Sequence, residues 1–300
     1  MKIQFLNGGL ANQTFQYIFT RYYELSHPGG KMYLDDSYFA LNTVHNGYEL
    51  EKVFPNVKPH FLSQCFDDDI WEYMLTEKQK GKSIPQILKE NQLPITMLSE
   101  FGDSYKSFNP FDGDVKYVNP HIFQPEICDI TFDNVYYHGY WIHKDWLYSY
   151  KEILLPELTF PDITEPNNME YMTAIKSTNS VSIHIRRGDF VDIGWELPTE
   201  EIREIIIYFL DNTPKHLNFH AFIFSDDIPW CRKNFLKIGL NKFFNCTFVE
   251  GNNNGLNYRD MQLMSNCKAM ILSNSSFGYL AALLNQTKQY TLNPFNQRPI

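Results

Sequence analysis

The segment Val181-Ser182-Ile183-His184-Ile185-Arg186-Arg187-Gly188-Asp189 decides how the second half of this chain is interpreted. Residues 181–185 have the composition of a buried strand, and a charged cluster follows at once. Downstream, short apolar segments alternate with segments whose apolar residues have helical spacing. Strands separated by helices of about a dozen residues are typical of βαβ units and of a parallel sheet. We therefore predict a Rossmann-like α/β unit here.

The expected elements of this unit alternate regularly along the chain. Strands are predicted at 181–185, 221–224, 246–249 and 270–272, and helices at 200–210, 230–238, 260–267 and 277–284. The first half also begins as α/β, with a strand at 2–6, a glycine turn at 7–9, a helix at 12–25 and a strand at 31–34. Further helices are expected at 68–80 and 84–91, and a strand at 135–140.

A proline-rich segment separates the two halves. Residues 156–168 contain Pro156, Pro161 and Pro166, a composition that argues against regular helix and is typical of a connection. A chain of 300 residues also corresponds to roughly two domains. We therefore expect an α/β lobe at 1–155 and a Rossmann-like lobe at 156–300.

The composition narrows the classes of function. Hydrophobic residues make up 43% of the chain, and 26 Lys and Arg against 35 Asp and Glu leave a net charge of −9. Such an acidic protein is not expected to hold nucleic acid, so an anionic ligand needs a local cluster of positive charge. No apolar run approaches the roughly 20 residues of a membrane span, and the start lacks a signal-peptide pattern. The 5 scattered cysteines suggest reduced thiols in a cytosolic protein.

Polar clusters follow three of the predicted strands, where α/β sheets bind ligands. Arg186 and Arg187 offer forked donors that match phosphate oxygens, although a salt-bridged surface pair is the alternative. Asp226 and Asp227 follow the next strand, where one carboxylate could cap a helix and the other contact a ligand. The segment 273–277, Ser-Asn-Ser-Ser-Phe, offers hydroxyls and backbone N–H groups as an anion cradle, or as a simple helix cap.

A fourth motif, Asn7-Gly8-Gly9-Leu10-Ala11-Asn12-Gln13, lies at the amino terminus. Its glycines allow close approach of a ligand to the backbone, and the amides of Asn12 and Gln13 suit sugar hydroxyls. Taken alone, this loop is a weak signal.

Together the four motifs resemble the α-1,2-fucosyltransferases of glycosyltransferase family 11. Residues 8–17 are similar to that family's GGLGNQMFQY opening, and residues 184–189 fit its HxRRxD signature. Residues 222–227, 264–268 and 274–277 are similar to its later blocks, 137–141 to its GYW segment, and 48–50 to its YEL. The resemblance implies a GT-B arrangement of two Rossmann-like lobes, with GDP-fucose in the carboxyl-terminal lobe. It also implies inverting, metal-independent transfer of L-fucose to the 2-hydroxyl of a terminal galactose in an oligosaccharide.

The resemblance further implies a role for each matching residue. Arg186 would grip the β-phosphate and Arg187 would brace its loop. His184 and Asp227 would face the guanine, with Asp226 nearby. Ser275, Ser276 and the backbone of Phe277 would hold phosphate oxygens, and Asn12, with Gly9 beside it, would reach the donor.

The base that takes the acceptor proton is left open by the sequence. Asp189 and Asp192 follow the arginines, and Glu196 is a third option, but Asp189 could equally be a salt-bridge partner. His143, Trp141 and Glu196 are expected on the acceptor side, although a lone histidine is more often structural. The acidic groups Asp35-Asp36 and 67–69 fit helix caps or loop charges better than a metal site.

Two other interpretations stay open. One is a fucosyltransferase of another linkage, of the α-1,6 or O-fucosyl type, and the other is a non-catalytic GDP-sugar-binding protein. The expected setting is the cytoplasm of a bacterium, in glycan or O-antigen assembly, with peripheral attachment to the inner membrane left open.

Overall fold

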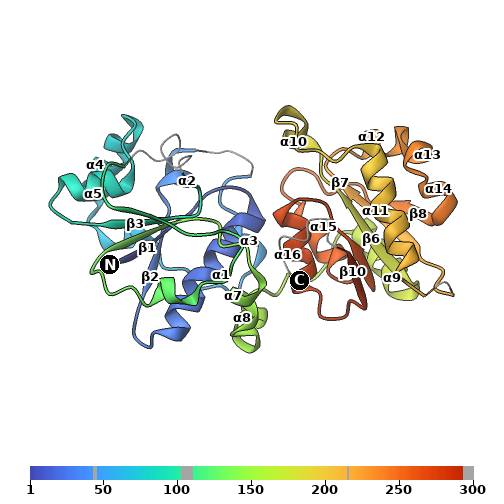
Figure 1. Ribbon diagram of the computed structural model, residues 1–300, viewed down its shortest axis with the longest axis horizontal. Helices are drawn as coiled ribbons and strands as arrows, with labels where there is room; N and C mark the ends of the chain where they lie inside the picture. Colours follow the sequence, from blue (N-terminus) through green and yellow to red (C-terminus); the bar gives the residue numbers. More distant parts are fainter. Residues whose placement is uncertain (43–45, 103–110, 215, 293–300) are drawn as a thin grey trace. The chain divides into compact units, whose positions relative to one another are not determined.

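The computed structural model describes residues 1–42, 46–102, 111–214 and 216–292 of the chain. The chain divides into two compact units, Met1–Thr159 and Phe160–Ile300. Each unit is built on a five-stranded, fully parallel sheet, with helices packed around it (Figure 1). The predicted α/β fold with two Rossmann-like units is confirmed.

The first unit has the strand order β2-β1-β5-β3-β4. Its strands are β1 (Lys2–Phe5), β2 (Met32–Asp35), β3 (Thr96–Ser99), β4 (Val115–Tyr117) and β5 (Val135–His138). Its helices are α1 (Leu10–Ser26), α2 (Ser37–Leu41), α3 (Leu50–Val53), α4 (Asp68–Gln79), α5 (Ile84–Glu90), α7 (Lys144–Tyr148) and α8 (Lys151–Glu157), with 3₁₀ turns η1 (Leu62–Cys65) and η3 (Pro125–Cys128). Ile3, Met97 and Tyr136 from the sheet pack against Met74 of α4 and Ile87 of α5 in one buried core.

The second unit has the strand order β10-β9-β6-β7-β8. Its strands are β6 (Ser180–Ile185), β7 (His220–Ser225), β8 (Asn245–Phe248), β9 (Ala269–Ile271) and β10 (Tyr290–Leu292). Its helices are α9 (Pro166–Ser177), α10 (Gly188–Asp192), α11 (Thr199–Asp211), α12 (Ile228–Lys233), α13 (Phe235–Ile238), α14 (Leu240–Phe243), α15 (Tyr258–Met264) and α16 (Ser276–Leu284). The chain moves outward from β6 to β7 and β8, and then returns to β9 on the other side of β6. This reversal is the position at which open α/β sheets bind ligands, at the carboxyl ends of the strands.

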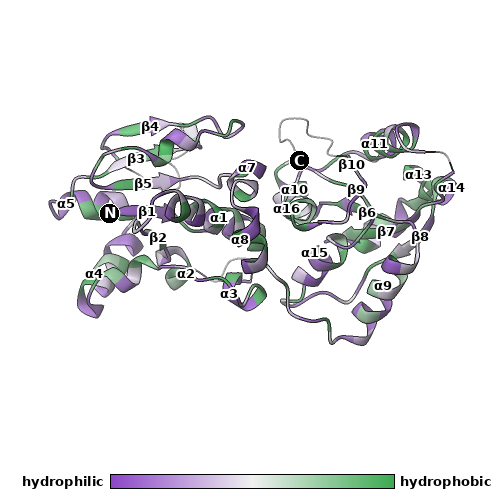
Figure 2. Cartoon of the chain, turned by 90° about the horizontal axis from the view of Figure 1, so that it is seen from below, coloured by the Kyte–Doolittle hydropathy of each residue, from purple (hydrophilic) through white to green (hydrophobic). Residues whose placement is uncertain are grey.

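Helix α11 shows why this unit holds together. Its buried residues Ile202, Ile206 and Phe209 recur at helical spacing and pack on the strands, whereas Glu200 and Glu201 are exposed (Figure 2). Each such side chain contributes about 1.5–3 kcal/mol by leaving water. None of the described helices is long and apolar enough to cross a lipid bilayer.

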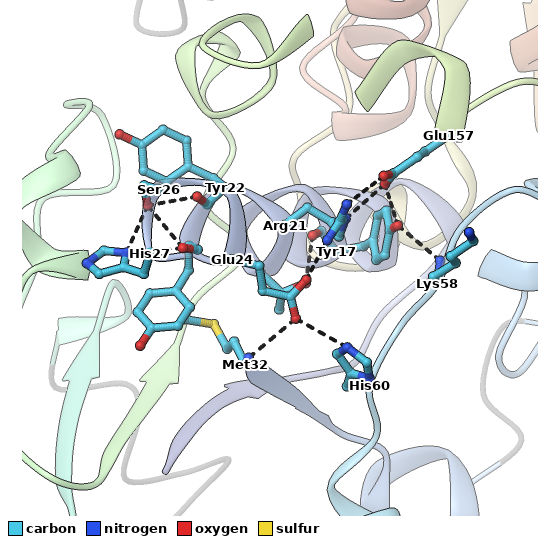
Figure 3. A network of polar contacts seen from close by, with 12 residues as sticks. Tyr17, Arg21, Tyr22, Glu24, Ser26, His27, Met32, Lys58, His60 and Glu157 are labelled. Carbon is cyan, nitrogen blue, oxygen red and sulfur yellow. Dashed lines mark hydrogen bonds and ion pairs between the residues drawn. The ribbon is translucent and has the colours of Figure 1, made fainter. Parts of the chain in front are cut away.

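The prediction that residues 156–168 contain no helix was wrong at both ends. Pro156 lies inside α8, and Pro166 begins α9, where a missing N–H costs nothing. Tertiary contacts hold α8: the Glu157 carboxylate accepts from the Tyr17 hydroxyl at 2.5 Å and from Arg21 Nη2 at 2.7 Å (Figure 3). Because Tyr17 and Arg21 belong to α1, the chain stays with the first unit past residue 155.

The helix predicted at 230–238 is also interrupted. Asn234 ends α12, and Gly239, at φ +86°, ends α13 in the left-handed conformation that glycine favours. Strands β3, β4 and β10 were not predicted, because they are short and follow irregular segments.

Candidate functional site

Two pairs of charged residues, Arg186-Arg187 and Asp226-Asp227, follow neighbouring strands of the second sheet. Strand β6 ends at Ile185, which is in register with Ser225 at the end of β7. Arg186 Nη1 lies 2.7 Å from Asp226 Oδ2, and the backbone N–H of Arg187 donates to Asp226 Oδ1 at 2.8 Å. Asp226 therefore binds both arginines and fixes the loop in which they lie.

Arg186 is held by acidic partners while part of its side chain faces solvent. Its Nη2 also lies 2.5 Å from Asp189 Oδ1, and 27% of the side chain is exposed. Its Nε is buried without a hydrogen-bond partner among the described residues. The guanidinium is thus oriented, with donors left over for an anion.

Gly188 permits this arrangement. A Cβ at Gly188 would lie 2.4 Å from Asp226 Oδ2, and the residue has φ +25°. Any side chain here would push the Asp226 carboxylate away from Arg186. Sequence reasoning did not single out Gly188, although its place between the arginines and Asp189 was a usable signal.

Arg187 and Asp227 support the loop. The Arg187 guanidinium lies 3.9 Å from the centre of the Trp230 ring, and its Nε lies 3.3 Å from Asp227 Oδ2. The other oxygen, Asp227 Oδ1, accepts from the backbone N–H of Trp230 at 3.0 Å and caps α12. The capping interpretation therefore holds for Asp227.

His184 joins β6 to the turn that follows β9. Its Nδ1 is 2.8 Å from the Ser273 hydroxyl, and a Cβ at Gly278 would lie 2.8 Å from the same nitrogen. Burial, with Arg186 nearby, lowers the pKa of His184 to about 3, so the imidazole is neutral at physiological pH. Because Nδ1 bonds to Ser273, Nε2 is the ring nitrogen that could donate to or accept from a ligand.

The turn from β9 into α16 lies at the strand-order reversal. The Ser275 hydroxyl accepts from the Phe277 N–H at 3.2 Å and caps α16, as the simpler interpretation expected. Ser276 and Phe277 occupy the first turn of α16 and are half-buried. The positive end of the α16 dipole thus follows β9, the strand that pairs with β6, and β6 leads into the two arginines.

The remaining carboxylates of this region follow Arg186 closely. Asp189 is paired with Arg186, which matches the salt-bridge alternative, and Asp192 is exposed at the end of α10. Glu196 is half-buried in the segment that leads to α11. Figure 1 shows α10 at one end of the second unit, beyond the sheet.

In the first unit, Gly8 and Gln13 of the glycine turn have structural roles, and the expected donor contacts of Gly9 and Asn12 stay predictions. Gly8 has φ +79°, and a Cβ there would lie 2.7 Å from Asn12 Nδ2, so this position requires glycine. Gly9 precedes α1 in an extended conformation. Gln13 is fully buried, and its Nε2 donates to the carbonyls of Gly8 and Gly47. The Gln13 amide is therefore consumed by the loop, and the interpretation of Gln13 as a sugar-binding residue was wrong.

Two of the residues expected on the acceptor side, Trp141 and His143, also have structural roles. Trp141 is 1% exposed, donates from Nε1 to Gln4 Oε1 at 2.6 Å, and stacks on Phe19 with ring centres 4.4 Å apart. It has no free face for a sugar, so the expected acceptor contact was wrong. The His143 Nδ1 accepts from the Asp145 N–H at 3.2 Å and caps α7, and burial lowers the pKa of this ring. His143 thus has the structural role that was its alternative.

The other acidic residues of the first unit have structural partners. Asp35 accepts from the Tyr136 hydroxyl at 2.6 Å, and Asp36 accepts from the Ser63 hydroxyl at 2.6 Å. Residues 67–69 begin α4, where negative charge suits the helix dipole. Within the described ranges, no three His, Cys, Asp or Glu side chains are grouped as metal ligands would be. All 5 cysteines are free thiols.

Comparison with known proteins identifies the family. Residues 125–299 match the model described as glycosyl transferase family 11. The chain belongs to this family. An alpha-1,2-colitosyltransferase of Escherichia coli is 30% identical to it over 295 residues, which cover 96% of this chain and 87% of that protein. The O-antigen biosynthesis glycosyltransferase WbnK of Escherichia coli is 25% identical over 299 residues, covering 93% of this chain and 89% of that protein.

Solved structures share the fold. A mutant of the FUT1 protein of Arabidopsis thaliana in complex with GDP superposes with a TM-score of 0.50 at 14% identity, covering 99% of this chain and 71% of that one. The alpha-1,6-fucosyltransferase NodZ soaked with GDP-fucose gives a TM-score of 0.48 at 11% identity, covering 94% and 92% of the two chains. The FUT1 structure, at a TM-score of 0.50, supports a fold of the GT-B kind. Membership of family 11 makes the chain a glycosyltransferase.

Proposed function

We propose that this protein transfers L-fucose from GDP-fucose to the 2-hydroxyl of a terminal galactose, with inversion and without a metal ion. The observation that carries the proposal is the position of Arg186, oriented by Asp189 and Asp226 where the strand order reverses. A partly exposed guanidinium at this position in an acidic protein suits a diphosphate.

In this proposal, Arg186 binds the β-phosphate and stabilises the charge that grows as the bond from the sugar C1 to the phosphate oxygen breaks. The N-terminus of α16, with Ser275, Ser276 and the Phe277 N–H, adds donors and a positive dipole end. His184 would contact the guanine, whereas the carboxylates of Asp226 and Asp227 would position the loop that carries the arginines. The departing GDP carries about two to three negative charges, which these groups would offset in place of magnesium.

The acceptor 2-hydroxyl must lose its proton as its oxygen attacks C1. Asp189 is already engaged with Arg186, so it is proposed as a positioning residue. Asp192 is exposed at the end of α10 and is proposed as the proton acceptor, with Glu196 as the alternative.

A second donor is favoured by one observation. The colitosyltransferase at 30% identity shares almost the full length of the chain. Colitose is fucose without its 3-hydroxyl, so the same diphosphate site would accept either GDP-sugar. The choice between them depends on whether the sugar site offers a partner to that hydroxyl, because a site built for a hydroxyl rejects an analogue that lacks it.

Parallel assays would test the proposal. The protein is incubated with lactose and either GDP-fucose or GDP-colitose, with and without EDTA, and the product linkage is determined by NMR. We expect an α-1,2-linked product that persists in EDTA. A strict magnesium requirement, another linkage, or GDP binding without transfer from either donor would each contradict the proposal.

A further inference from the structure

An exposed apolar surface follows directly after the two arginines. Phe190, Val191, Ile193 and Trp195, here called the Trp195 platform, lie in and beyond α10. Val191, Ile193 and Trp195 are 41%, 55% and 63% exposed. Large apolar side chains gathered within five residues at the surface mark a contact site more often than a chance exposure.

The platform is anchored to the site. The backbone N–H of Trp195 donates to the Phe190 carbonyl at 2.8 Å, which closes the turn. The rings of the two residues pack edge to face with their centres 5.8 Å apart. The Arg186 guanidinium lies 5.3 Å from the centre of the Phe190 ring. On the other side, Asn274 Nδ2 donates to the Trp195 carbonyl at 2.6 Å. The backbone of Trp195 is therefore tied both to the loop after β6 and to the turn after β9, and its indole packs on Phe190.

We propose that Trp195 stacks on a pyranose ring of the acceptor oligosaccharide. This inference rests on the proposed function and adds to it the residue that holds the acceptor. A sugar ring presents an apolar C–H face and a rim of hydroxyls. The indole matches the face, and the carboxylates of Asp192 and Glu196, on either side of it in the chain, match the hydroxyls.

Charge argues against an anionic lipid surface as the occupant. The segment 188–196 carries Asp189, Asp192 and Glu196 and no Lys or Arg. The two arginines before it are paired with Asp189, Asp226 and Asp227. A membrane rich in anionic lipid would be repelled by this rim, whereas a neutral oligosaccharide is not.

The test uses Trp195→Ala and Trp195→Phe in the full-length protein, with Tyr208→Ala as the control. Tyr208 is exposed on α11 of the same unit and matches Trp195 as an exposed aromatic. Steady-state kinetics with lactose and the active donor are combined with GDP titration calorimetry and saturation-transfer NMR on lactose. We expect Trp195→Ala to raise the KM for lactose about tenfold or more and to abolish saturation transfer to the galactose protons. Trp195→Phe should recover most of the KM, and GDP affinity should stay within about twofold in all variants.

Each other outcome overturns the inference. Unchanged lactose KM in Trp195→Ala, beside an active wild type, removes the stacking role and leaves the proposed function standing. Loss of GDP affinity or of folding in both Trp195 variants would make the residue structural. If Trp195→Ala keeps its lactose KM but loses sedimentation with phosphatidylglycerol vesicles, the platform is a membrane contact. A wild type without transfer or lactose binding refutes the proposed function, and the inference with it.

Discussion

The two units have the same kind of sheet but use its carboxyl edge differently. In the described part of the first unit, several polar groups beyond the strands are bound internally. Asp35 binds Tyr136, Glu100 Oε2 accepts from the N–H groups of Tyr140 and Trp141, and Gln13 bonds to the glycine turn. In the second unit, Arg186 and Asp189 pair with each other and are still partly exposed to solvent.

The sequence motifs at the two edges look alike, because polar residues follow a strand in both. The structure gives those residues different roles. Both edges carry motifs, and at the second edge Arg186 stays within reach of a ligand. A motif at a strand end therefore indicates a ligand site only where its polar groups are not required by the fold itself.

The largest effect is expected from Arg186→Ala. Removing a preorganised donor from a developing charge should lower kcat by about 10²–10³. Thermal unfolding should change little, because the side chain is partly exposed. Arg232→Ala is the matched control: its guanidinium is exposed and paired with Glu250 in the same unit, and kcat should stay within about twofold. Wild-type kcat in a folded Arg186→Ala protein would refute the role.

Gln13→Ala should have the opposite profile. Three hydrogen bonds would be lost, to the carbonyls of Gly8 and Gly47 and from the N–H of Glu49. At about 1 kcal/mol each, the free energy of unfolding should fall by about 3 kcal/mol, as measured by urea denaturation. The exposed Gln79→Ala should change it by less than about 0.5 kcal/mol. A Gln13→Ala protein as stable as wild type but unable to bind acceptor would show that this edge is a ligand site too.

Asp189→Asn should have a moderate effect. Its carboxylate holds Arg186 Nη2, but Asp226 still holds Nη1, so kcat should fall about tenfold. The shape of the pH–rate profile should not change. Disappearance of the acidic limb, with a loss of about 10² or more, would instead identify Asp189 as the general base.

The smallest effect is expected at Asp260 of the second unit, on the pH dependence of stability. Burial raises the pKa of Asp260 from 3.8 to about 7, although Asn252 Nδ2 donates to it at 2.6 Å. Between these values the folded state binds more protons than the unfolded state, so this group makes stability fall as pH rises from about 4 to about 7. Asp260→Asn should lessen the decrease in Tm between pH 5 and pH 8. An unchanged pH dependence in that variant would contradict the assignment.

The predictable parts of the molecule are those in which local pattern and burial agree. Strands β7 and β9 contain apolar runs, as parallel strands buried on both faces usually do. Strand β6 is also buried throughout, although Ser182 and His184 alternate with its apolar residues. The site motifs follow these strands directly. The Asp227 cap was also foreseeable, because capping needs only residues a few positions away.

The failures depended on contacts far away in sequence. Trp141 is buried because Gln4 of β1 accepts from its indole. Pro156 is tolerated in a helix because Glu157 is bound by Tyr17 and Arg21. No local pattern near Trp141 or Pro156 indicates such partners. The Trp195 platform was missed because an exposed apolar residue becomes informative only when its neighbours are seen to be exposed as well.

The most direct test of the account compares GDP with GMP, since the two differ only in the β-phosphate. Calorimetric titration of wild type should give a Kd for GDP at least about tenfold below that for GMP. Arg186→Ala should bind both nucleotides with equal affinity, at the wild-type Kd for GMP. An Arg186→Ala protein that keeps the preference for GDP would show that another group binds the β-phosphate.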